Sequence, residues 1–373
     1  MSELVLYRKY RPRGFDEVVG QDHVTSVIKN AIESGRVAHA YLFAGPRGVG
    51  KTTVARLIAK ALNCTVGKNR PCNACALCED FNMGRAPDII EIDAASNRGI
   101  DEIRELREGV RYVPTSGRYK TYIIDECHML TKDAFNALLK TLEEPPEHAI
   151  FILATTELEK VPATIVSRTQ KYDFRRPNAG EIRSRLSLIA KKESAAIEPG
   201  AAHLIAIAAE GSLRDAESIL GQVMAVEDKT ITRAIVEEIL GHPPRQAAKE
   251  LFTFVAKKDV SQALSLVQRL TDAGHDMHLV AKILMRYWRA ALFLKTDPGL
   301  EGFLAEEFLP DEIECIKANI SLLTQEGISC GVEILFDNLQ RFRRTPIPQL
   351  PLELAVVALA DLGGNVEQSH GSS

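Results

Sequence analysis

The sequence lacks any apolar run long enough to span a membrane. Its longest apolar stretches, such as residues 201–209, are too short to cross a bilayer, and the basic N-terminus has no hydrophobic core of the kind that a signal peptide carries. A strong excess of positive charge is also missing, because the formal net charge is −4. That balance argues against a protein that coats nucleic acid along its surface. We therefore expect a cytoplasmic protein without a membrane partner, whose cysteines are reduced or bound to metal.

The sequence does contain a glycine-rich loop between an apolar run and a helical segment. Residues 45–52 read GPRGVGKT and fit the phosphate-binding loop pattern at every required position. Residues 40–44 are typical of a buried strand, and the Ala- and Leu-rich residues 53–62 of a helix. In such a loop, backbone N–H groups and the helix dipole attract an anion. We expect Lys51 to reach the β- and γ-phosphates of a nucleotide and Thr52 to bind Mg²⁺.

Two acidic residues follow a later apolar run. Residues 119–124 are rich in β-forming side chains and lead directly into Asp125 and Glu126. Adjacent side chains at the end of a strand diverge, so the two carboxylates can do different work. We expect Asp125 to hold the Mg²⁺ shell and Glu126 to act as the general base that polarises the attacking water. Acids in this place after a phosphate loop favour an ATPase over a P-loop kinase or a simple nucleotide binder.

A further strand, residues 148–154, ends in Thr155 and Thr156. A hydroxyl at this position could contact the γ-phosphate or its water and so distinguish ATP from ADP. Threonine is also common in strands, so the pattern alone favours neither interpretation.

Four of the seven cysteines, Cys64, Cys72, Cys75 and Cys78, fall within fifteen residues. Their spacing suits a tetrahedral thiolate site for structural zinc. A 4Fe–4S cluster is one alternative, although ferredoxin runs usually close with a Cys-Pro pair that this chain does not have. Reduced thiols without a metal are the other alternative.

Several short motifs within the first 221 residues point to the same family. They are Tyr10-Arg11-Pro12, Val18-Val19-Gly20-Gln21, the loop at 45–53, the segments 125–130 and 136–146, Ser167-Arg168, and residues 211–216. Together they resemble the gamma/tau subunits of the bacterial DNA polymerase III clamp loader, which are AAA+ ATPases. The helical remainder of the chain carries few motifs.

The resemblance implies an adenine and ribose pocket near the N-terminus, a first sensor at Thr155 and Thr156, and a second sensor in a helical lid. Arg214 occupies the second sensor motif, from which it would reach the phosphates. The residues expected to contact ATP are Tyr7, Tyr10, Arg11, Val18, Val19, Gly45, Pro46, Arg47, Gly48, Val49, Gly50, Lys51, Thr52, Thr53, Thr155, Thr156 and Arg214. The family also carries zinc at the four cysteine positions, so the resemblance favours zinc there, in a surface module without a catalytic role.

Ser167-Arg168 matches a Ser-Arg-Cys motif of the family, whose arginine acts on ATP held by the adjacent subunit. This chain has Thr169 where the family usually has cysteine. The arginine is the chemically necessary member, since a guanidinium can bridge the charge that develops on the γ-phosphoryl oxygens. A surface ion-pair partner is the alternative role for Arg168. The expected catalytic residues are therefore Lys51, Asp125, Glu126 and Arg168.

A helix after residues 93–97 would face the central chamber of a clamp loader, according to the resemblance. Arg104, Arg107 and Arg111 recur there at helical spacing, but acidic residues interleave with them. A solvated face with ion pairs is therefore as good an interpretation as a phosphate track. Arg98, beside a glycine at the start of this helix, is the best candidate for a DNA contact.

With 373 residues, 45% of them hydrophobic, the chain should hold two or three domains. We expect an α/β fold, an AAA+ P-loop core with a parallel sheet over residues 1–176 that includes a zinc module at 64–78. A helical lid should follow over 177–242, then an all-α collar for oligomerisation over 243–362 and a polar tail at 363–373. Family members usually continue further, so this chain could be a truncated form.

Together with these features, the resemblance implies an ATP-driven motor subunit of the clamp loader that uses ATP, Mg²⁺ and Zn²⁺. The resemblance implies assembly with delta, delta prime and further copies of itself, and action on the sliding clamp and primer-template DNA. A ring-forming remodeller or helicase of the same superfamily is one alternative, but it should lack the cysteine module and the collar. A non-hydrolysing scaffold subunit is the other, and the intact Lys51, Glu126 and Arg168 argue against it.

Overall fold

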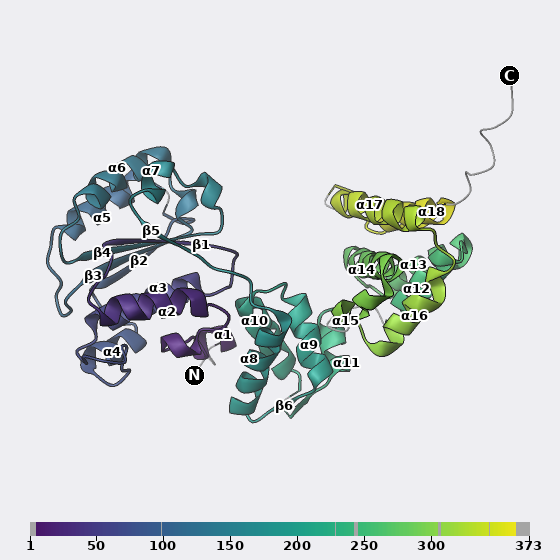
Figure 1. The fold of residues 1–373 in the computed structure, drawn as a ribbon, viewed down its shortest axis with the longest axis horizontal. Coiled ribbons are helices and arrows are strands. Elements are labelled where there is room, and N and C mark those ends of the chain that lie inside the picture. Colours follow the sequence, from purple (N-terminus) through teal and green to yellow (C-terminus); the bar gives the residue numbers. More distant parts are fainter. Residues whose placement is uncertain are drawn as a thin grey trace, which may run out of the picture. The chain divides into compact units, whose positions relative to one another are not determined.

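The fold is that of a computed structural model, which describes residues 5–97, 99–227, 229–241, 245–304, 307–342 and 344–362, without the side chains of residues 100, 101 and 245 (Figure 1). It divides into two compact units, Met1–Ile231 and Thr232–Ser373. This division precedes the linker that the composition suggests. Residues 242–244 of that linker and the expected tail at 363–373 lie outside the described residues. Among the described helices, none combines the length and the apolar character needed to cross a membrane.

A five-stranded parallel sheet forms the centre of the first unit, with the strand order β2-β3-β4-β1-β5. Its strands are β1 (Ala40–Ala44), β2 (Ile89–Asp93), β3 (Lys120–Asp125), β4 (Ala149–Thr155) and β5 (Gln170–Asp173). The register pairs Ala44 with Thr155 and Asp93 with Asp125, so these strands end level at one edge. Ligands of open parallel sheets bind at this carboxyl edge.

Helices cover both faces of the sheet (Figure 1), which is why β1 and β4 are buried along their whole length. They are α2 (Asp22–Glu33) and α3 (Lys51–Asn63) on one face, and α5 (Ile100–Val110), α6 (Lys132–Glu143) and α7 (Ala163–Val166) on the other. Successive side chains of a strand point to opposite faces. Tyr41 and Phe43 of β1 accordingly pack with α2 and α3, whereas Leu42 packs with α5 and α6. The predicted α/β core with a parallel sheet is confirmed.

A helical lid completes the first unit. It contains α8 (Ala179–Lys192), α9 (Pro199–Ala208), α10 (Leu213–Met224) and the short parallel strands β6 (Ala196–Ile197) and β7 (Thr230–Ile231). A capping box starts α8, because Asn178 Oδ1 accepts the backbone N–H of Glu181 at 2.8 Å and Glu181 Oε2 accepts that of Asn178 at 2.7 Å. The N-terminal helix α1 (Leu6–Lys9) contacts α10 and so joins the start of the chain to the lid.

The second unit is helical throughout its described residues. Its helices are α11 (Arg233–Ile239), α12 (Arg245–Ala256), α13 (Val260–Asp272), α14 (Met277–Thr296), α15 (Glu301–Leu304), α16 (Pro310–Ile320), α17 (Gln325–Arg341) and α18 (Leu350–Asp361). Trp288 of α14 is buried with its ring 5.5 Å from that of Phe252. Gly331 of α17 faces this indole, and a Cβ there would lie 2.0 Å from Trp288 Nε1. The tryptophan therefore packs α17 closely onto α14, and the predicted helical region is confirmed.

Candidate active site

The glycine-rich loop joins β1 to α3 at the carboxyl edge of the sheet. Gly50 precedes α3 with φ 105°, a conformation that L side chains rarely adopt. At Gly48, with φ 77°, a Cβ atom would lie 2.0 Å from Ser212 Oγ at the start of α10. Glycine at these positions therefore lets the loop turn tightly and lets the lid approach it.

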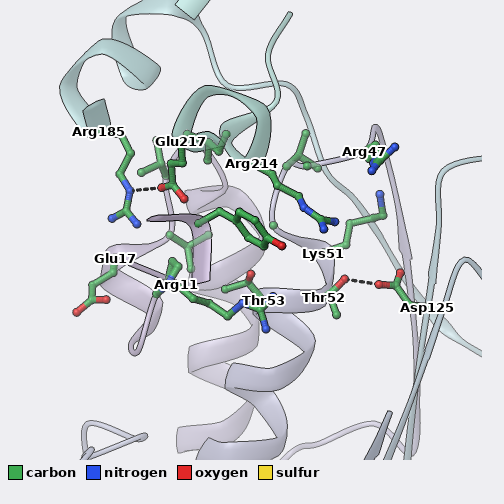
Figure 2. Close-up of a pocket in the computed structure, with 18 of the residues that line it drawn as sticks. Arg11, Glu17, Arg47, Lys51, Thr52, Thr53, Asp125, Arg185, Arg214 and Glu217 are labelled. Carbon is green, nitrogen blue, oxygen red and sulfur yellow. Dashed lines mark hydrogen bonds and ion pairs between the residues drawn. The ribbon is translucent and has the colours of Figure 1, made fainter. Parts of the chain in front are cut away.

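A pocket of about 450 Å³ opens over this loop, and core, lid and N-terminal segment all line it (Figure 2). The predicted site residues among its lining are Tyr7, Arg11, Val18, Val19, Arg47, Gly48, Val49, Gly50, Lys51, Thr52, Thr53, Asp125, Glu126 and Arg214. Five further predicted ATP contacts do not line it: Tyr10, Gly45, Pro46, Thr155 and Thr156. The fold thus brings most of the expected residues, from segments far apart in sequence, around one space.

At one end of the pocket, Lys51 and Thr52 begin α3 beside Asp125. Lys51 Nζ donates to the carbonyls of Gly45 at 2.6 Å and Pro46 at 2.7 Å. Burial lowers the pKa of Lys51, and the nearby carboxylates act in the opposite direction. Thr52 Oγ1 donates to Asp125 Oδ2 at 2.6 Å. A hydroxyl and a carboxylate oxygen this close fit the hard oxygen ligands that Mg²⁺ requires.

Glu126 follows β3 and turns sharply away from it. Its backbone has φ 48° and ψ 44°, a left-handed conformation that non-glycine residues seldom adopt. Thr156 Oγ1 donates to Glu126 Oε2 at 2.9 Å. His128 Nδ1 lies 3.4 Å from the same oxygen, a contact that no pattern in the sequence predicts. Thr156, directly after β4, therefore contacts the acid that the sequence predicts to be the base, and Thr155 at the end of β4 contacts His128 Nδ1 at 3.0 Å. Neither threonine lines the pocket.

The N-terminal segment and the lid form another part of the pocket lining. Arg214 of α10 lies over the ring of Tyr7, 4.8 Å from its centroid, and a hydrogen bond with Arg214 lowers the pKa of the Tyr7 phenol. The phenol of Tyr10 lies in a different environment, where burial and a hydrogen bond with Glu193 raise its pKa to about 12. The Tyr10 side chain therefore contacts the end of the lid helix α8, whereas Tyr7 lines the pocket.

A buried ion pair, which no pattern in the sequence predicts, joins two lid helices in this part of the lining. Arg185 Nε of α8 donates to Glu217 Oε1 of α10 at 2.8 Å, and both side chains are only 8% exposed. Arg185 Nη2 also donates to the carbonyl of Tyr10. Figure 2 shows this pair away from Lys51, Thr52 and Asp125. Partners from different helices leave no periodic pattern in the sequence, so no local signal could have found them.

Arg168 does not line the pocket of its own chain. It follows α7, where its Nη2 lies 2.7 Å from Glu143 Oε1 of α6 and its Nη1 donates to the carbonyl of Thr164 at 2.9 Å. Both members of the ion pair are exposed to solvent. The guanidinium is thus displayed on the surface formed by α6 and α7.

The four clustered cysteines converge at the far end of α3. Their Sγ atoms all lie within 4.8 Å of one another, and those of Cys72 and Cys78 are 4.0 Å apart. Zinc–sulfur bonds of about 2.3 Å place the sulfurs of a tetrahedral site about 3.8 Å apart. Lys60 of α3 donates to Asn82 Oδ1 of α4 (Ala76–Asn82) at 2.6 Å and thereby ties this module to the core. The donor set and its spacing fit a four-thiolate zinc site.

The predicted DNA contact Arg98 lies outside the described residues. The helix that follows, α5, buries Ile103, Leu106 and Val110 against the sheet and exposes Arg104. The solvent-facing side of α5 therefore includes Arg104, one of the three arginines that recur at helical spacing.

Sequence-family models match three consecutive parts of the chain. The model described as DNA polymerase III, delta subunit matches residues 20–178, and the one described as DNA polymerase III clamp loader subunit, ATPase lid domain, matches residues 181–229. The model described as DNA polymerase III subunits gamma and tau domain III matches residues 231–368. The first two matches adjoin at the capping box of α8, and the third starts where the two compact units divide.

Curated relatives agree with these matches. The chain is 43% identical to DNA polymerase III subunit tau of Bacillus subtilis, over 96% of this chain and 63% of that protein. It is 45% identical to DNA polymerase III subunit tau of Escherichia coli, over 78% of this chain and 44% of that protein. It is 38% identical to DNA polymerase III subunit gamma of Buchnera aphidicola, over 86% of this chain and 89% of that protein. The chain thus spans less than two thirds of the two tau relatives and most of the gamma relative.

Proposed function

Because the chain belongs to the gamma and tau family of DNA polymerase III subunits, we propose that it is an ATP-hydrolysing motor subunit of a clamp loader. It would work within the DNA polymerase III holoenzyme and load the sliding clamp onto primer-template DNA during replication. The observation that carries this proposal is the convergence of a phosphate loop, the Thr52–Asp125 pair and the lid residue Arg214 around one pocket.

In the proposed binding mode, the phosphates of ATP lie at the loop and the adenine lies toward Tyr7, Val18 and Val19. The loop and the start of α3 offer backbone N–H donors to the phosphates. Lys51 would exchange the two loop carbonyls that it now contacts for β- and γ-phosphate oxygens. This exchange is favourable because Lys51 is buried, where attraction to an anion is screened less than in water.

Hydrolysis would depend on the two acids at the end of β3. Mg²⁺ held by Thr52 and Asp125 would neutralise charge on the phosphates. Glu126 would accept a proton from the attacking water while the oxygen of that water bonds to the γ-phosphorus. The bond between the γ-phosphorus and the β–γ bridging oxygen breaks at the same time. ADP and phosphate are the products. Thr155 and Thr156 would sense the γ-phosphate through their contacts near Glu126, and Arg214 would contact the phosphates from the lid.

We further propose that Arg168 acts on ATP held by an adjacent subunit. Its exposed position just after α7, paired with Glu143 of α6 and outside its own pocket, supports this role. Residues 1–176 would be the AAA+ core, 177–242 the lid and 243–362 a collar through which the chain assembles with delta, delta prime and further copies of itself. Arg98 would contact primer-template DNA, and the complex would act in the cytoplasm.

A zinc ion bound by Cys64, Cys72, Cys75 and Cys78 would crosslink the end of α3 to α4. Two of these cysteines are buried and their sulfurs have the spacing of a tetrahedral site, which supports a structural role. The module lies at the opposite end of α3 from Lys51, so it would stabilise the core without taking part in hydrolysis.

ATPase rates of the chain assembled with its partner subunits, with and without clamp and primed DNA, test the proposal. We expect clamp and primed DNA together to stimulate ATP hydrolysis. The Glu126→Gln substitution should remove the hydrolysis. Absence of hydrolysis in every mixture would favour a scaffold subunit. Unwinding of duplex DNA by the pure protein would favour a ring-forming helicase.

A further inference from the structure

His128 is a buried histidine beside the proposed general base, and the mechanism above gives it no role. Its side chain is 5% exposed. It belongs to the short 3-10 helix η2 (Cys127–Met129), which directly follows Glu126. Buried polar groups normally have hydrogen-bond partners, and the identity of these partners indicates what the imidazole does.

The two ring nitrogens contact different segments of the carboxyl edge. Nδ1 lies 3.0 Å from Thr155 Oγ1 and 3.4 Å from Glu126 Oε2. Nε2 lies 3.1 Å from Glu157 Oε1. Because β3 and β4 are neighbours in the sheet, the imidazole bridges the turns that leave these two strands.

Glu126 depends on such partners because its backbone is held in an unfavourable conformation. The left-handed region, which its φ of 48° occupies, is unfavourable for a residue other than glycine. Thr156 Oγ1 donates to Glu126 Oε2 at 2.9 Å, and His128 approaches the same oxygen. The orientation of this carboxylate is therefore set by the turn after β4 and by the imidazole together.

Glu157 extends the connection toward Arg168. Its backbone N–H donates to Thr155 Oγ1 at 3.0 Å, and its Oε2 pairs with Lys160 Nζ at 2.6 Å in the 3-10 helix η3 (Leu158–Lys160). The chain then continues through α7 to Arg168. Through Glu157, His128 contacts the start of the segment that displays this arginine.

We propose that His128 is a positioning residue for ATP hydrolysis, which orients the Glu126 carboxylate to accept the proton of the attacking water and fastens it to the turn at Thr155–Glu157. This inference rests on the proposed role of Glu126 as general base. His128 acts through that carboxylate and does not contact ATP. A displacement of about 1 Å in a catalytic group can cost about a hundredfold in rate, so loss of the imidazole should lower kcat and leave ATP binding intact.

Steady-state ATPase kinetics of the assembled complex, with clamp and primed DNA, test this inference. We expect His128→Ala to lower kcat by about 10- to 100-fold and to leave KM within about twofold, since the imidazole acts on the base and not on ATP binding. His128→Gln should retain more activity, because its amide can still hydrogen-bond Glu157 or Thr155. The matched control is His148→Gln at the start of β4, where Nε2 lies 3.0 Å from the carbonyl of Val110, and it should keep the parental kcat.

A double-mutant cycle distinguishes positioning from a general loss of structure. In single-turnover measurements on the Glu126→Gln background, His128→Ala should cause no further loss, because its effect passes through the carboxylate. The inference would be overturned if His128→Ala kept the parental kcat or raised KM in place of lowering kcat. It would also be overturned if His128→Ala lowered the rate equally in the parental and the Glu126→Gln proteins. If circular dichroism shows that His128→Ala is unfolded, the same kinetics are measured on Glu157→Gln. A lower kcat of that variant supports the inference, and the parental kcat rejects it. Parental turnover by Glu126→Gln would reject the role of Glu126 as general base on which this inference rests, whereas absence of hydrolysis in every mixture would reject the proposed function itself.

Discussion

Arg168 Nη2 lies 2.7 Å from Glu143 Oε1, so the proposed trans-acting guanidinium is paired within its own subunit. The two side chains are 36% and 48% exposed. A solvent-exposed ion pair of this kind contributes only about 0–1 kcal/mol. Arg168 can therefore exchange Glu143 for a phosphate of a neighbouring subunit at little cost.

We expect Arg168→Ala to leave the ATP affinity of the isolated chain nearly unchanged and to remove the stimulation of hydrolysis by clamp and primed DNA. An arginine that acts in trans stabilises charge in the transition state and contributes about a thousandfold or more to the rate. Nucleotide-binding titrations and steady-state ATPase rates measure the two effects. Glu143→Gln is the matched control and should keep most of the stimulation.

Mixing variants tests whether the arginine serves another subunit. Arg168→Ala chains mixed with Lys51→Ala chains should regain part of the activity wherever an intact arginine meets an intact ATP site. Full DNA-stimulated turnover by the Arg168→Ala protein would show that this residue is only a surface ion-pair partner.

Lys51→Ala should abolish ATP binding, whereas Glu126→Gln should bind ATP and fail to hydrolyse it. In the proposed mechanism, the ammonium contacts phosphates in the ground state, whereas the carboxylate is needed only when water is activated, where a general base contributes about 10²–10⁴-fold. Binding of a fluorescent ATP analogue and phosphate release separate these outcomes. Hydrolysis at the parental rate by Glu126→Gln would show that another group is the base.

Metal analysis of the purified protein should give about one zinc per chain. Cys78→Ser should lower that content and the thermal stability of the first unit, because Cys78 is a fully buried member of the cluster. Cys315→Ser in the second unit is the control and should keep the metal. A colourless sample without metal, or a brown one with iron, would contradict the zinc assignment.

Arg185→Met should lower the free energy of unfolding by about 3–5 kcal/mol, because it leaves Glu217 buried without its partner. The double variant Arg185→Met/Glu217→Leu should recover most of that loss. Burial already raises the pKa of Glu217, so the folded single variant holds a proton more readily than the unfolded chain does. Its loss of stability relative to the parent should therefore become smaller as the pH falls. Unfolding curves at several pH values measure this, and equal stability of the parent and Arg185→Met would contradict it.

Short spacings along the chain are enough to predict the local parts of the site. A phosphate loop needs its glycines at fixed positions between a strand and a helix, so GPRGVGKT predicted the turn, the start of α3 and the place of Lys51. The cysteines are likewise close enough in the chain for their spacing alone to predict a cluster. The parallel sheet followed from the apolar runs and the helices between them.

Contacts between residues that are far apart in the chain depend on strand order and helix packing. The order β2-β3-β4-β1-β5 places the end of β3 beside that of β4, and this neighbourhood brings His128 to Thr155 and Glu157. Packing of α8 against α10 similarly pairs Arg185 with Glu217, and it directs the side chain of Tyr10 to the lid while Tyr7 lines the pocket. Such contacts join segments whose separation in the chain follows no period, so their partners are fixed by strand order and helix packing and not by any pattern along the sequence.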